Sequence, residues 1–537
     1  MVHSDNDETH AAAPGAAGIS GPGGPGSGGA PGGPSAATGR ESSRESSSES
    51  PSESPEDSGL RRTLTNRHMQ MIAIGGAIGT GLFVASGATV SQAGPGGAIA
   101  AYTAVGLMVL LLMQSLGEMT AHMPVAGSFQ TYATRFVSPS FGFAMGWNYW
   151  FNWAITVAAE LVAAGIIMAY WLPDVPSWVW AGLFLVVLTG LNALSARAFG
   201  EGEFWLSAIK VVTVVVFLIA GAAMIAGILG GHRAGLSNWT VGDAPFHGGA
   251  LAVVSVFMIA GFSFQGTELV GVAAGEARNP RRDVPRAIRT VFWRIMLFYI
   301  GAIAVVGTLV AYNDPRLLRT GTEDVSYSPF TLVFDRAGIA AAAAVMNAVI
   351  LTAVLSAGNS GLYASTRMLH SMALQGQAPQ WFGYVNRHGV PVRALGATAL
   401  VGAAGFLTAV VGQDTAYSWL LNVSALSGFI VWVGIAVCHF RFRRAYVLQG
   451  HDPADLPYRA PLFPLGPVVA FIMCVVVILG QNYEAVFRGE LLGVLSSYIG
   501  LPAFFLVWLG HRLTRGTPMV PLAEVDVSGA AAPRGDR

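Results

Sequence analysis

Residues 71–83 read MIAIGGAIGTGLF, with four glycines in the seven positions from Gly75 to Gly81. The apolar run that contains them, at about residues 69–91, is long enough to cross the ~30 Å hydrocarbon core of a bilayer as a helix. Each glycine in a helix interior is less favourable than alanine by about 1 kcal/mol. Hydrocarbon offers unpaired backbone groups no partner, so a spanning helix can unwind only where it lines a cavity or is buried in protein.

A second long apolar run, at about residues 250–275, has a similar interruption. Its centre reads IAGFSFQGTELV over residues 259–270, with glycine and polar residues in place of a continuous apolar stretch. Helix packing through small residues is an alternative explanation for the first glycine cluster, but it does not account for two interruptions. Two interrupted spans are typical of inverted repeats, with the binding site near the centre of the membrane.

The composition indicates a membrane protein. Apolar residues make up 53% of the 537 residues and charged residues only 11%, against about a quarter charged in soluble proteins. This excludes a soluble enzyme or a nucleic-acid-binding protein for most of the chain. Twelve apolar runs are candidate membrane spans, and the interrupted runs are the first and the sixth. The runs are at about residues 69–91, 98–118, 143–169, 178–195, 204–229, 250–275, 290–312, 337–365, 394–412, 418–440, 466–482 and 492–513.

The ends of the chain differ from this apolar region. Residues 1–59 contain 32 Gly, Ser and Pro residues and cannot bury enough apolar surface to fold, so we expect a disordered cytoplasmic tail. We expect a twelve-helix domain over residues 60–515 and a short cytoplasmic tail over residues 516–537. With both termini inside, 22 of the 28 basic residues after position 59 fall on the cytoplasmic side, which agrees with the positive-inside rule.

Other chemistries have little support in the sequence. The two cysteines, Cys438 and Cys474, lie in apolar runs, and the histidines have no metal-binding spacing. We therefore expect no metal and no cofactor. The basic loops, which include the arginines from Arg278 to Arg294 and from Arg441 to Arg444, are interpreted as topology signals and not as a nucleic-acid surface.

Several motifs resemble one transporter family. Residues 75–83 and the loop EARNPRRDVPRAI at residues 276–288 resemble the amino acid–polyamine–organocation (APC) superfamily of permeases. Residues 261–269, 346–360 and 446–452 are similar to the bacterial lysine-specific permeases within it. The resemblance covers about residues 60–515, and the long amino-terminal tail departs from it.

The resemblance implies an all-α membrane protein with a LeuT-type fold. About twelve transmembrane helices would form a 5+5 inverted repeat with helices 1 and 6 broken, plus two C-terminal helices. It also implies secondary active import of lysine, and also of arginine, with proton symport by alternating access. The location would be the bacterial cytoplasmic (inner) membrane.

An amino acid substrate needs donors for its carboxylate and acceptors for its amine. We assign the carboxylate to backbone N–H groups freed in the first interruption and to the Thr80 hydroxyl, because a half-helix end attracts anions. Freed carbonyl groups in the second interruption would accept from the amine. Phe264 is a candidate aromatic lid, with core packing as the alternative. The predicted substrate-binding residues are Gly76, Ile78, Gly79, Thr80, Gly81, Ser263, Phe264, Gly266 and Glu268.

A cationic side chain also needs a buried counter-charge. The candidates are Glu118, Glu160 and Glu268, since ionisable residues in membrane spans usually mark functional sites. Glu268 is a predicted ligand or coupling residue, and capping its half-helix is the alternative. Glu118 is either a proton site or the partner of Arg135 or of a loop arginine. Glu160 is either a ligand or an interior carboxylate paired with a neighbouring helix.

Lys210 is the only lysine in the chain. In proton-coupled relatives of this fold a lysine on the fifth span lies where sodium-coupled relatives hold an ion, so the resemblance implies a proton-coupling role. The alternative is that Lys210 extends to the inner surface of the membrane. Ser356 and Asn359 on the eighth span are further candidates for the same region.

Other functions remain open at this point. One is a permease for aromatic or neutral amino acids, and another is a transporter-fold sensor that reports lysine to a regulatory membrane protein partner. An ion channel is a third, which the paired interruptions disfavour. The expected partners are a small-molecule amino acid, a proton and membrane lipid.

Overall fold

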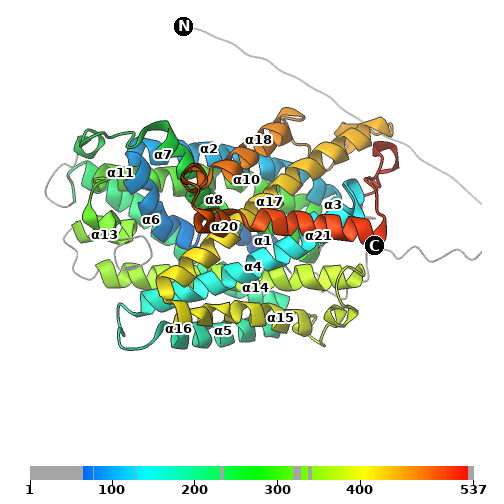
Figure 1. Cartoon of the computed structure of the whole chain (residues 1–537), viewed down its shortest axis with the longest axis horizontal. Coiled ribbons are helices and arrows are strands. Elements are labelled where there is room, and N and C mark those ends of the chain that lie inside the picture. The colour runs from blue at the N-terminus through cyan, green and yellow to red at the C-terminus, as the bar shows by residue number, and fades with distance from the viewer. Residues whose placement is uncertain are drawn as a thin grey trace, which may run out of the picture. The chain divides into compact units, whose positions relative to one another are not determined.

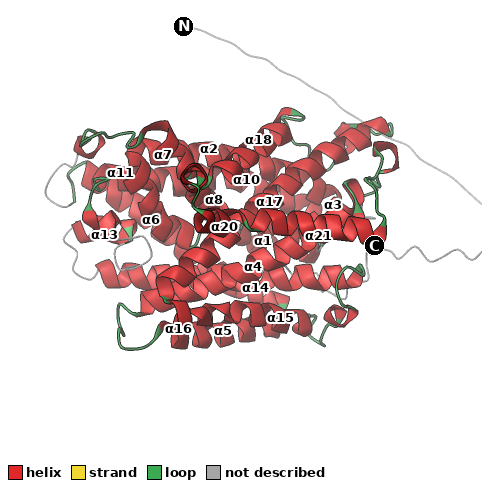
Figure 2. Cartoon of the chain, viewed as in Figure 1, coloured by secondary structure: helices red, strands yellow, loops and turns green. Residues whose placement is uncertain are grey.

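A computed structural model of the chain describes residues 64–529, apart from residues 77, 126, 230–234, 319–327 and 337–341. Every described residue belongs to one compact unit, which lies within Ser54–Arg537. The predicted disordered tail at residues 1–59 lies outside the described residues. Helices connected by loops make up the described part, which contains no β-strand (Figure 2).

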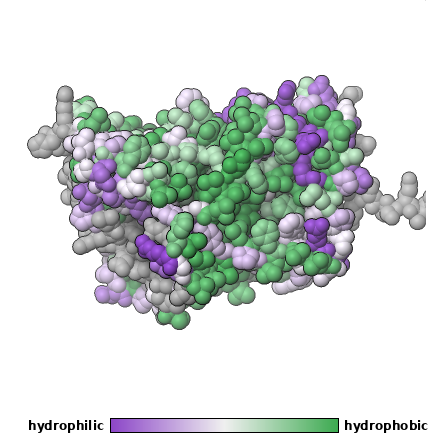
Figure 3. Space-filling model, turned by 45° about the horizontal axis from the view of Figure 1, so that its top comes forward, coloured by the Kyte–Doolittle hydropathy of each residue, from purple (hydrophilic) through white to green (hydrophobic). Residues whose placement is uncertain are grey.

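Ten helices in the described residues are long and apolar enough to cross a membrane. The expectation of an all-α, multi-pass membrane protein is therefore confirmed. The outer surface is apolar as well: Val212 and Ile219 are 61% and 66% exposed, as expected of side chains that face lipid. On the face drawn in Figure 3, hydrophobic residues form a broad area with hydrophilic residues mainly toward its two ends.

The first interruption is present in the structure. Helix α1 (Asn66–Gly75) ends within the glycine cluster, and helical structure resumes as a short π-helix, η1 (Gly81–Ala85), that continues into α2 (Ser86–His122). Helix α2 is bent at Gly94, whose φ of 72° is readily adopted only by glycine. The predicted runs 69–91 and 98–118 thus occupy α1, η1 and α2, divided differently from the prediction.

The second interruption lies between α8 (Phe257–Phe264) and α9 (Leu269–Ala273). Helix α7 (Gly249–Ser255) precedes α8, and one 3-10 turn, η3 (Ala274–Glu276), follows α9. Gly266 in the connection has a φ of 94°, a conformation that side chains other than hydrogen disfavour. The two local signals read from the sequence therefore coincide with the two helix breaks.

The remaining helices and turns complete the described part of the chain. The predicted run 492–513 forms two of these helices, which meet at Ile499. The helices are α3 (Ser128–Phe136), α4 (Pro139–Met168), α5 (Ser177–Leu194), α6 (Ala196–Ile225), α10 (Pro280–Arg294), α11 (Ala302–Leu309), α12 (Pro315–Leu318), α13 (Pro329–Arg336), α14 (Ala342–Leu374), α15 (Val392–Gly402), α16 (Thr408–Val411), α17 (Gln413–Leu448), α18 (Leu465–Gly480), α19 (Tyr483–Arg488), α20 (Leu491–Tyr498) and α21 (Gly500–Arg515). A π-helix, η4 (Ile295–Gly301), joins α10 to α11. The short 3-10 helices are η2 (Ser237–Trp239), η6 (Gln380–Gly383), η7 (Ala403–Leu407), η8 (Pro453–Asp455) and η9 (Leu522–Glu524).

Helix packing places the two interruptions inside the bundle. Helix α4 runs beside α14 and α17, and α5 and α15 cover α4 and α14 on their other side (Figure 1). Helix α1 packs against α6, α9 and α10, while α8 packs against α2 and η1. Each broken segment is thus enclosed by long helices, where its free backbone groups can find partners.

The carboxyl-terminal segment, residues 516–529, folds back onto the helix ends. The Val520 N–H donates to the Val137 carbonyl at 2.9 Å, and the Gln449 side chain donates to the Val525 carbonyl at 2.7 Å. The His122 ring contacts the Val527 carbonyl at 2.8 Å. This segment therefore connects the ends of α2, α3 and α17.

Candidate functional site

The two interruptions lie against one another. A methyl group added at Gly81 would come within 2.5 Å of the Ser263 Cα atom, so only glycine allows this approach. A methyl group at Gly76 would lie 3.5 Å from the Gly266 carbonyl oxygen. The structure thus brings together the predicted residues of both broken segments.

A small cavity of about 20 Å³ lies beside the first interruption. One water needs roughly 10–15 Å³, so the cavity in this conformation is too small for an amino acid. A substrate could enter only after the surrounding helices moved apart. The lining residues come from the first interruption, α4, the second interruption and α14: they are Gly76, Gly79, Gly81, Trp153, Thr156, Glu160, Phe262, Gln265 and Ala357.

Glu160 is the carboxylate that lines this cavity. The Thr80 hydroxyl donates to Glu160 Oε1 at 3.1 Å, so a predicted carboxylate donor and a predicted counter-charge are neighbours. The other oxygen, Glu160 Oε2, is buried and has no hydrogen-bond partner among the described residues, and the same holds for Trp153 Nε1. A buried carboxylate oxygen without a donor is costly, and an ammonium group in the cavity would supply one.

Glu268 binds the connection between α8 and α9, and its side chain makes no capping hydrogen bond to the first turn of α9. Its two carboxylate oxygens accept from the Gly266 N–H at 3.1 and 3.3 Å, and the Trp432 indole donates to one of them at 3.4 Å. Glu268 is not among the residues that line the small cavity. In this conformation Glu268 therefore neither caps α9 through its side chain nor lines the small cavity, and its role as ligand or coupling residue stays a prediction.

Lys210 is completely buried, so it does not extend to the membrane surface. Its ammonium donates to the Gly75 carbonyl oxygen at 2.9 Å, at the end of α1. The carboxylate of Glu203 lies 4.0 Å away and also accepts from the Ser356 hydroxyl at 2.7 Å. Glu203 was not among the predicted site residues, although its spacing of seven residues from Lys210 places both on one face of a helix.

Glu118 pairs with Arg443, one of the arginines that the sequence placed in the basic loops, but Arg443 lies in α17 and is buried. Arg443 of α17 donates from Nε to Glu118 Oε1 at 2.6 Å and from a second nitrogen to Oε2. The Ala460 N–H donates to Oε2 at 2.7 Å, and His439 Nε2 lies 3.2 Å from Oε1. Arg135, the other partner considered, instead pairs with the carboxyl-terminal segment.

Phe264 belongs to a buried aromatic cluster. Its ring stacks on Tyr299 at 4.2 Å between centroids, and Tyr102 lies beside both rings. The Tyr102 hydroxyl is 2.9 Å from the Ser263 hydroxyl. Phe264 is thus packed in the core in this conformation. This agrees with core packing, the alternative to an aromatic lid.

Two predicted residues have their polar groups engaged elsewhere. The Ile78 N–H donates to the Gly75 carbonyl at 3.1 Å, which leaves it unavailable to a substrate carboxylate here. The Asn359 side chain accepts from Asn192 on α5 at 2.7 Å. Neither residue lines the small cavity.

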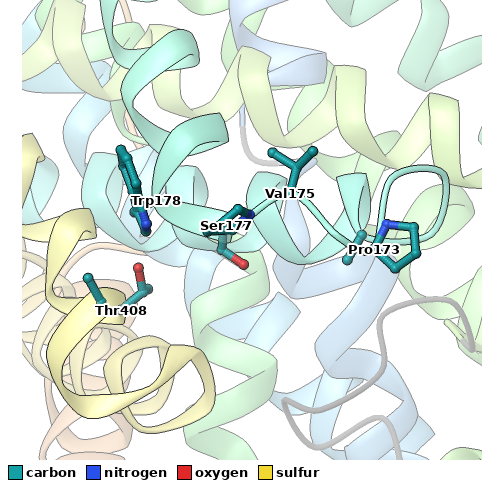
Figure 4. Close-up of a pocket in the computed structure, with 8 residues that line it drawn as sticks. Pro173, Val175, Ser177, Trp178 and Thr408 are labelled. Atoms are coloured by element: carbon teal, nitrogen blue, oxygen red, sulfur yellow. The ribbon is translucent and has the colours of Figure 1, made fainter.

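A larger pocket of about 500 Å³ lies away from both interruptions. The loop before α5 and the start of α16 face one another across it, with Trp178 and Thr408 on its walls (Figure 4). None of its lining residues belongs to α1, η1, α8 or α9. Its size therefore does not make it the candidate substrate site.

Comparisons with known proteins identify the family of this fold. The family model described as "Amino acid permease" matches residues 68–520. The chain is 58% identical over 470 residues to "Lysine-specific permease LysP" of Escherichia coli, which covers 87% of this chain and 96% of that protein. It is 49% identical over 475 residues to "Lysine-specific permease LysP" of Lactococcus lactis, covering 87% and 93%. It is 47% identical over 470 residues to "Histidine permease HisP" of the same species, covering 87% and 98%.

Proposed function

The chain belongs to the amino acid permease family, whose members are membrane transporters and not enzymes, and we propose that it imports lysine, and also arginine. The membrane would be the bacterial cytoplasmic membrane, with both termini inside. Two relatives named as lysine-specific permeases support this substrate class. The observation that carries the proposal is the Glu160 carboxylate, which lines the cavity between the helix breaks with one oxygen unpaired.

The proposed binding mode uses three parts of this site. Backbone N–H groups around Gly79 to Gly81 bind the substrate carboxylate, at the positive end of the half-helix that begins there. The Thr80 hydroxyl, which donates to Glu160, holds the counter-charge in place. Carbonyl groups freed near Ser263 accept from the α-amine. The cationic side chain pairs with Glu160, because a buried ammonium without a counter-charge is costly.

Transport requires the cavity to widen and to open on each side of the membrane in turn. We assign this motion to the two broken segments, within a twelve-helix arrangement of five plus five helices and two more.

The proton-coupling group in this proposal is Lys210. When its ammonium loses a proton, the Gly75 carbonyl loses a charged donor, which links the protonation state of Lys210 to the position of α1.

A second candidate substrate is histidine or a neutral amino acid. The 47% identity to a histidine permease favours this alternative, and Trp153 in the cavity wall could contact a ring. A third possibility is a sensor that binds lysine and signals to a membrane partner. Accumulation of substrate by the purified protein alone would contradict a purely sensory function.

The test is uptake by purified protein in liposomes at fixed pH and voltage. Labelled lysine would be offered with unlabelled lysine, arginine, histidine, phenylalanine or γ-aminobutyrate as competitors. We expect lysine to compete best, and an inward proton gradient to drive accumulation at zero voltage. Stronger competition by histidine or phenylalanine would assign the protein to the second candidate, and no effect of the gradient would exclude proton symport.

Two matched variants distinguish the candidate counter-charges. Glu160→Gln should weaken lysine binding at least about tenfold, since losing one partner of a buried charge pair costs about 2–5 kcal/mol. Glu268→Gln keeps an oxygen that can accept from the Gly266 N–H and should preserve more of the lysine affinity. The opposite ranking would show that Glu268 contacts the substrate cation, as the sequence analysis expected.

A further inference from the structure

Arg294 is a buried cation that the proposed mechanism does not use. It is the last residue of α10 and is only 2% exposed, although the sequence analysis counted it among the loop arginines. Its guanidinium donates to the Ala73 carbonyl oxygen, in the last turn of α1. Its remaining nitrogens, Nε and Nη2, have no hydrogen-bond partner in the described part of the chain.

The position of Arg294 matters because α1 stops inside the bundle. The last carbonyl groups of a helix lack partners within it and carry the negative end of its dipole. At the end of α1, the Ile72 carbonyl accepts from the Gly76 N–H at 3.0 Å. The Ala73 carbonyl accepts from Arg294, and the Gly75 carbonyl accepts from Lys210 at 2.9 Å. Two cations from two different helices thus cap the same half-helix end.

The two cations differ in chemistry. A buried lysine can lose its proton near neutral pH, whereas the arginine guanidinium stays charged in proteins. If only Lys210 held the end of α1, deprotonation would leave that end without a cation. Arg294 supplies a charge that does not change during such a step.

We propose that Arg294 is a positioning residue for transport, which holds the C-terminal end of α1 through the Ala73 carbonyl while Lys210 gains and loses its proton. This inference rests on the proposed transport function but not on the identity of the substrate. Arg294 acts through α1 and not through contact with the substrate, since it does not line the small cavity.

The other ionisable groups around Arg294 are known from the packing. Glu268 lies at the start of α9, Tyr299 follows on η4, and Tyr102 lies on α2 beside Tyr299. Helix α1 itself has Arg67 and His68 only at its far end, about two turns from Ala73. Lys210 is thus the titrating group that shares the end of α1 with Arg294.

The test compares Arg294→Lys and Arg294→Gln with wild-type protein in liposomes. Substrate exchange would be measured with no proton gradient, using whichever amino acid the wild-type protein transports, and binding would be measured separately. Arg289→Gln is the matched control, because Arg289 is an exposed arginine on the same helix. We expect Arg294→Gln to slow exchange about ten- to a hundredfold, as a misplaced site element does, with substrate binding changed much less.

The pH profile of Arg294→Lys separates positioning from general stability. A lysine at this site keeps the charge only while protonated, and buried lysines can titrate as low as about pH 5–6. The exchange rate of this variant relative to wild type should therefore fall over about two pH units around the pKa of the introduced lysine, within the range from about pH 5 to about pH 9. A flat ratio, or an Arg294→Gln protein that exchanges at the wild-type rate, would overturn the inference.

Two further results have defined meanings. If Arg294→Gln does not elute as a folded species from gel filtration, the pH profile of Arg294→Lys alone decides the question. If wild-type protein exchanges histidine and not lysine, the proposed substrate is wrong. The Arg294 comparison then proceeds with histidine, so the two failures are distinguishable.

Discussion

The pair formed by Glu118 and Arg443 provides the most direct test of the packing. The two residues lie 325 positions apart in sequence and join α2 to α17 through two hydrogen bonds. Both side chains are buried, with at most 4% of either exposed. We predict that Arg443→Met destabilises the folded protein by about 3–5 kcal/mol, the usual cost of leaving one member of a buried ion pair without its partner.

The contacts account for this magnitude. Removing the guanidinium deletes two charge-assisted hydrogen bonds, each contributing about 1.5–3 kcal/mol. The carboxylate keeps the Ala460 N–H at 2.7 Å and the His439 ring at 3.2 Å. Because these two contacts remain, the loss in free energy of unfolding should lie near the lower end of the range that the two deleted hydrogen bonds give together. The exposed neighbour Arg444 is the matched control, and Arg444→Met should cost less than about 1 kcal/mol.

A double variant tests whether the loss arises from the unpaired charge. Replacing Glu118 and Arg443 together by leucine removes both charges, and such replacements are often neutral or stabilising. The Ala460 N–H would then lack its acceptor, at a cost of about 1–3 kcal/mol. The double variant should therefore be more stable than Arg443→Met.

The assay is unfolding by SDS in mixed micelles, followed by tryptophan fluorescence, for all four proteins. The predicted order of stability is wild type and Arg444→Met, then the double variant, then Arg443→Met. Two results would refute the reasoning: an Arg443→Met protein within about 1 kcal/mol of wild type, or a double variant as unstable as the single one.

Two other predictions concern the helix breaks and a surface cluster. Gly81→Ala places a methyl group 2.5 Å from the backbone of α8 and should abolish most uptake. In the control variant Gly190→Ala the added methyl group meets no atom within 4 Å, so this variant should transport normally. Equal uptake by the two variants would contradict the packing. Hydrogen bonds from Tyr312 and His247 hold the pKa of Asp243 at about 2, below its usual 3.8. This contribution to stability is complete above pH 3.8 and is lost as the pH falls through about 2. Tyr312→Phe should therefore weaken the pH dependence of unfolding in that range, and an unchanged pH profile would argue against the hydrogen bond.

The helix breaks could be predicted from the sequence because their causes are local. Glycine clusters and polar residues within an apolar run weaken a helix wherever the chain later packs, and both interruptions fall where the sequence placed them. The division of the first two spans was harder to predict. It depends on the bend at Gly94, where the Pro245 carbonyl accepts from the N–H groups of Gly96 and Gly97 at 2.9 and 3.3 Å.

The partners of the buried charges could not be predicted in the same way. Arg294 and Arg443 were read as loop residues because hydropathy windows average over a run and place its edges several residues off. Their partners, Ala73 and Glu118, lie 221 and 325 residues away. No local pattern identifies such pairs, whereas Glu203 and Lys210 share a helix face and their spacing could have revealed them.

The carboxyl-terminal segment has a practical consequence for protein engineering. A chain shortened after Arg515 would lose the carbonyl groups to which Arg441 and Gln449 donate, together with the buried side chains of Val525 and Val527. Purification tags and fluorescent fusions placed at Arg515 would therefore disturb the ends of several helices. Attachment beyond residue 529 leaves those interactions intact, so deletion libraries should treat this stretch as part of the folded body.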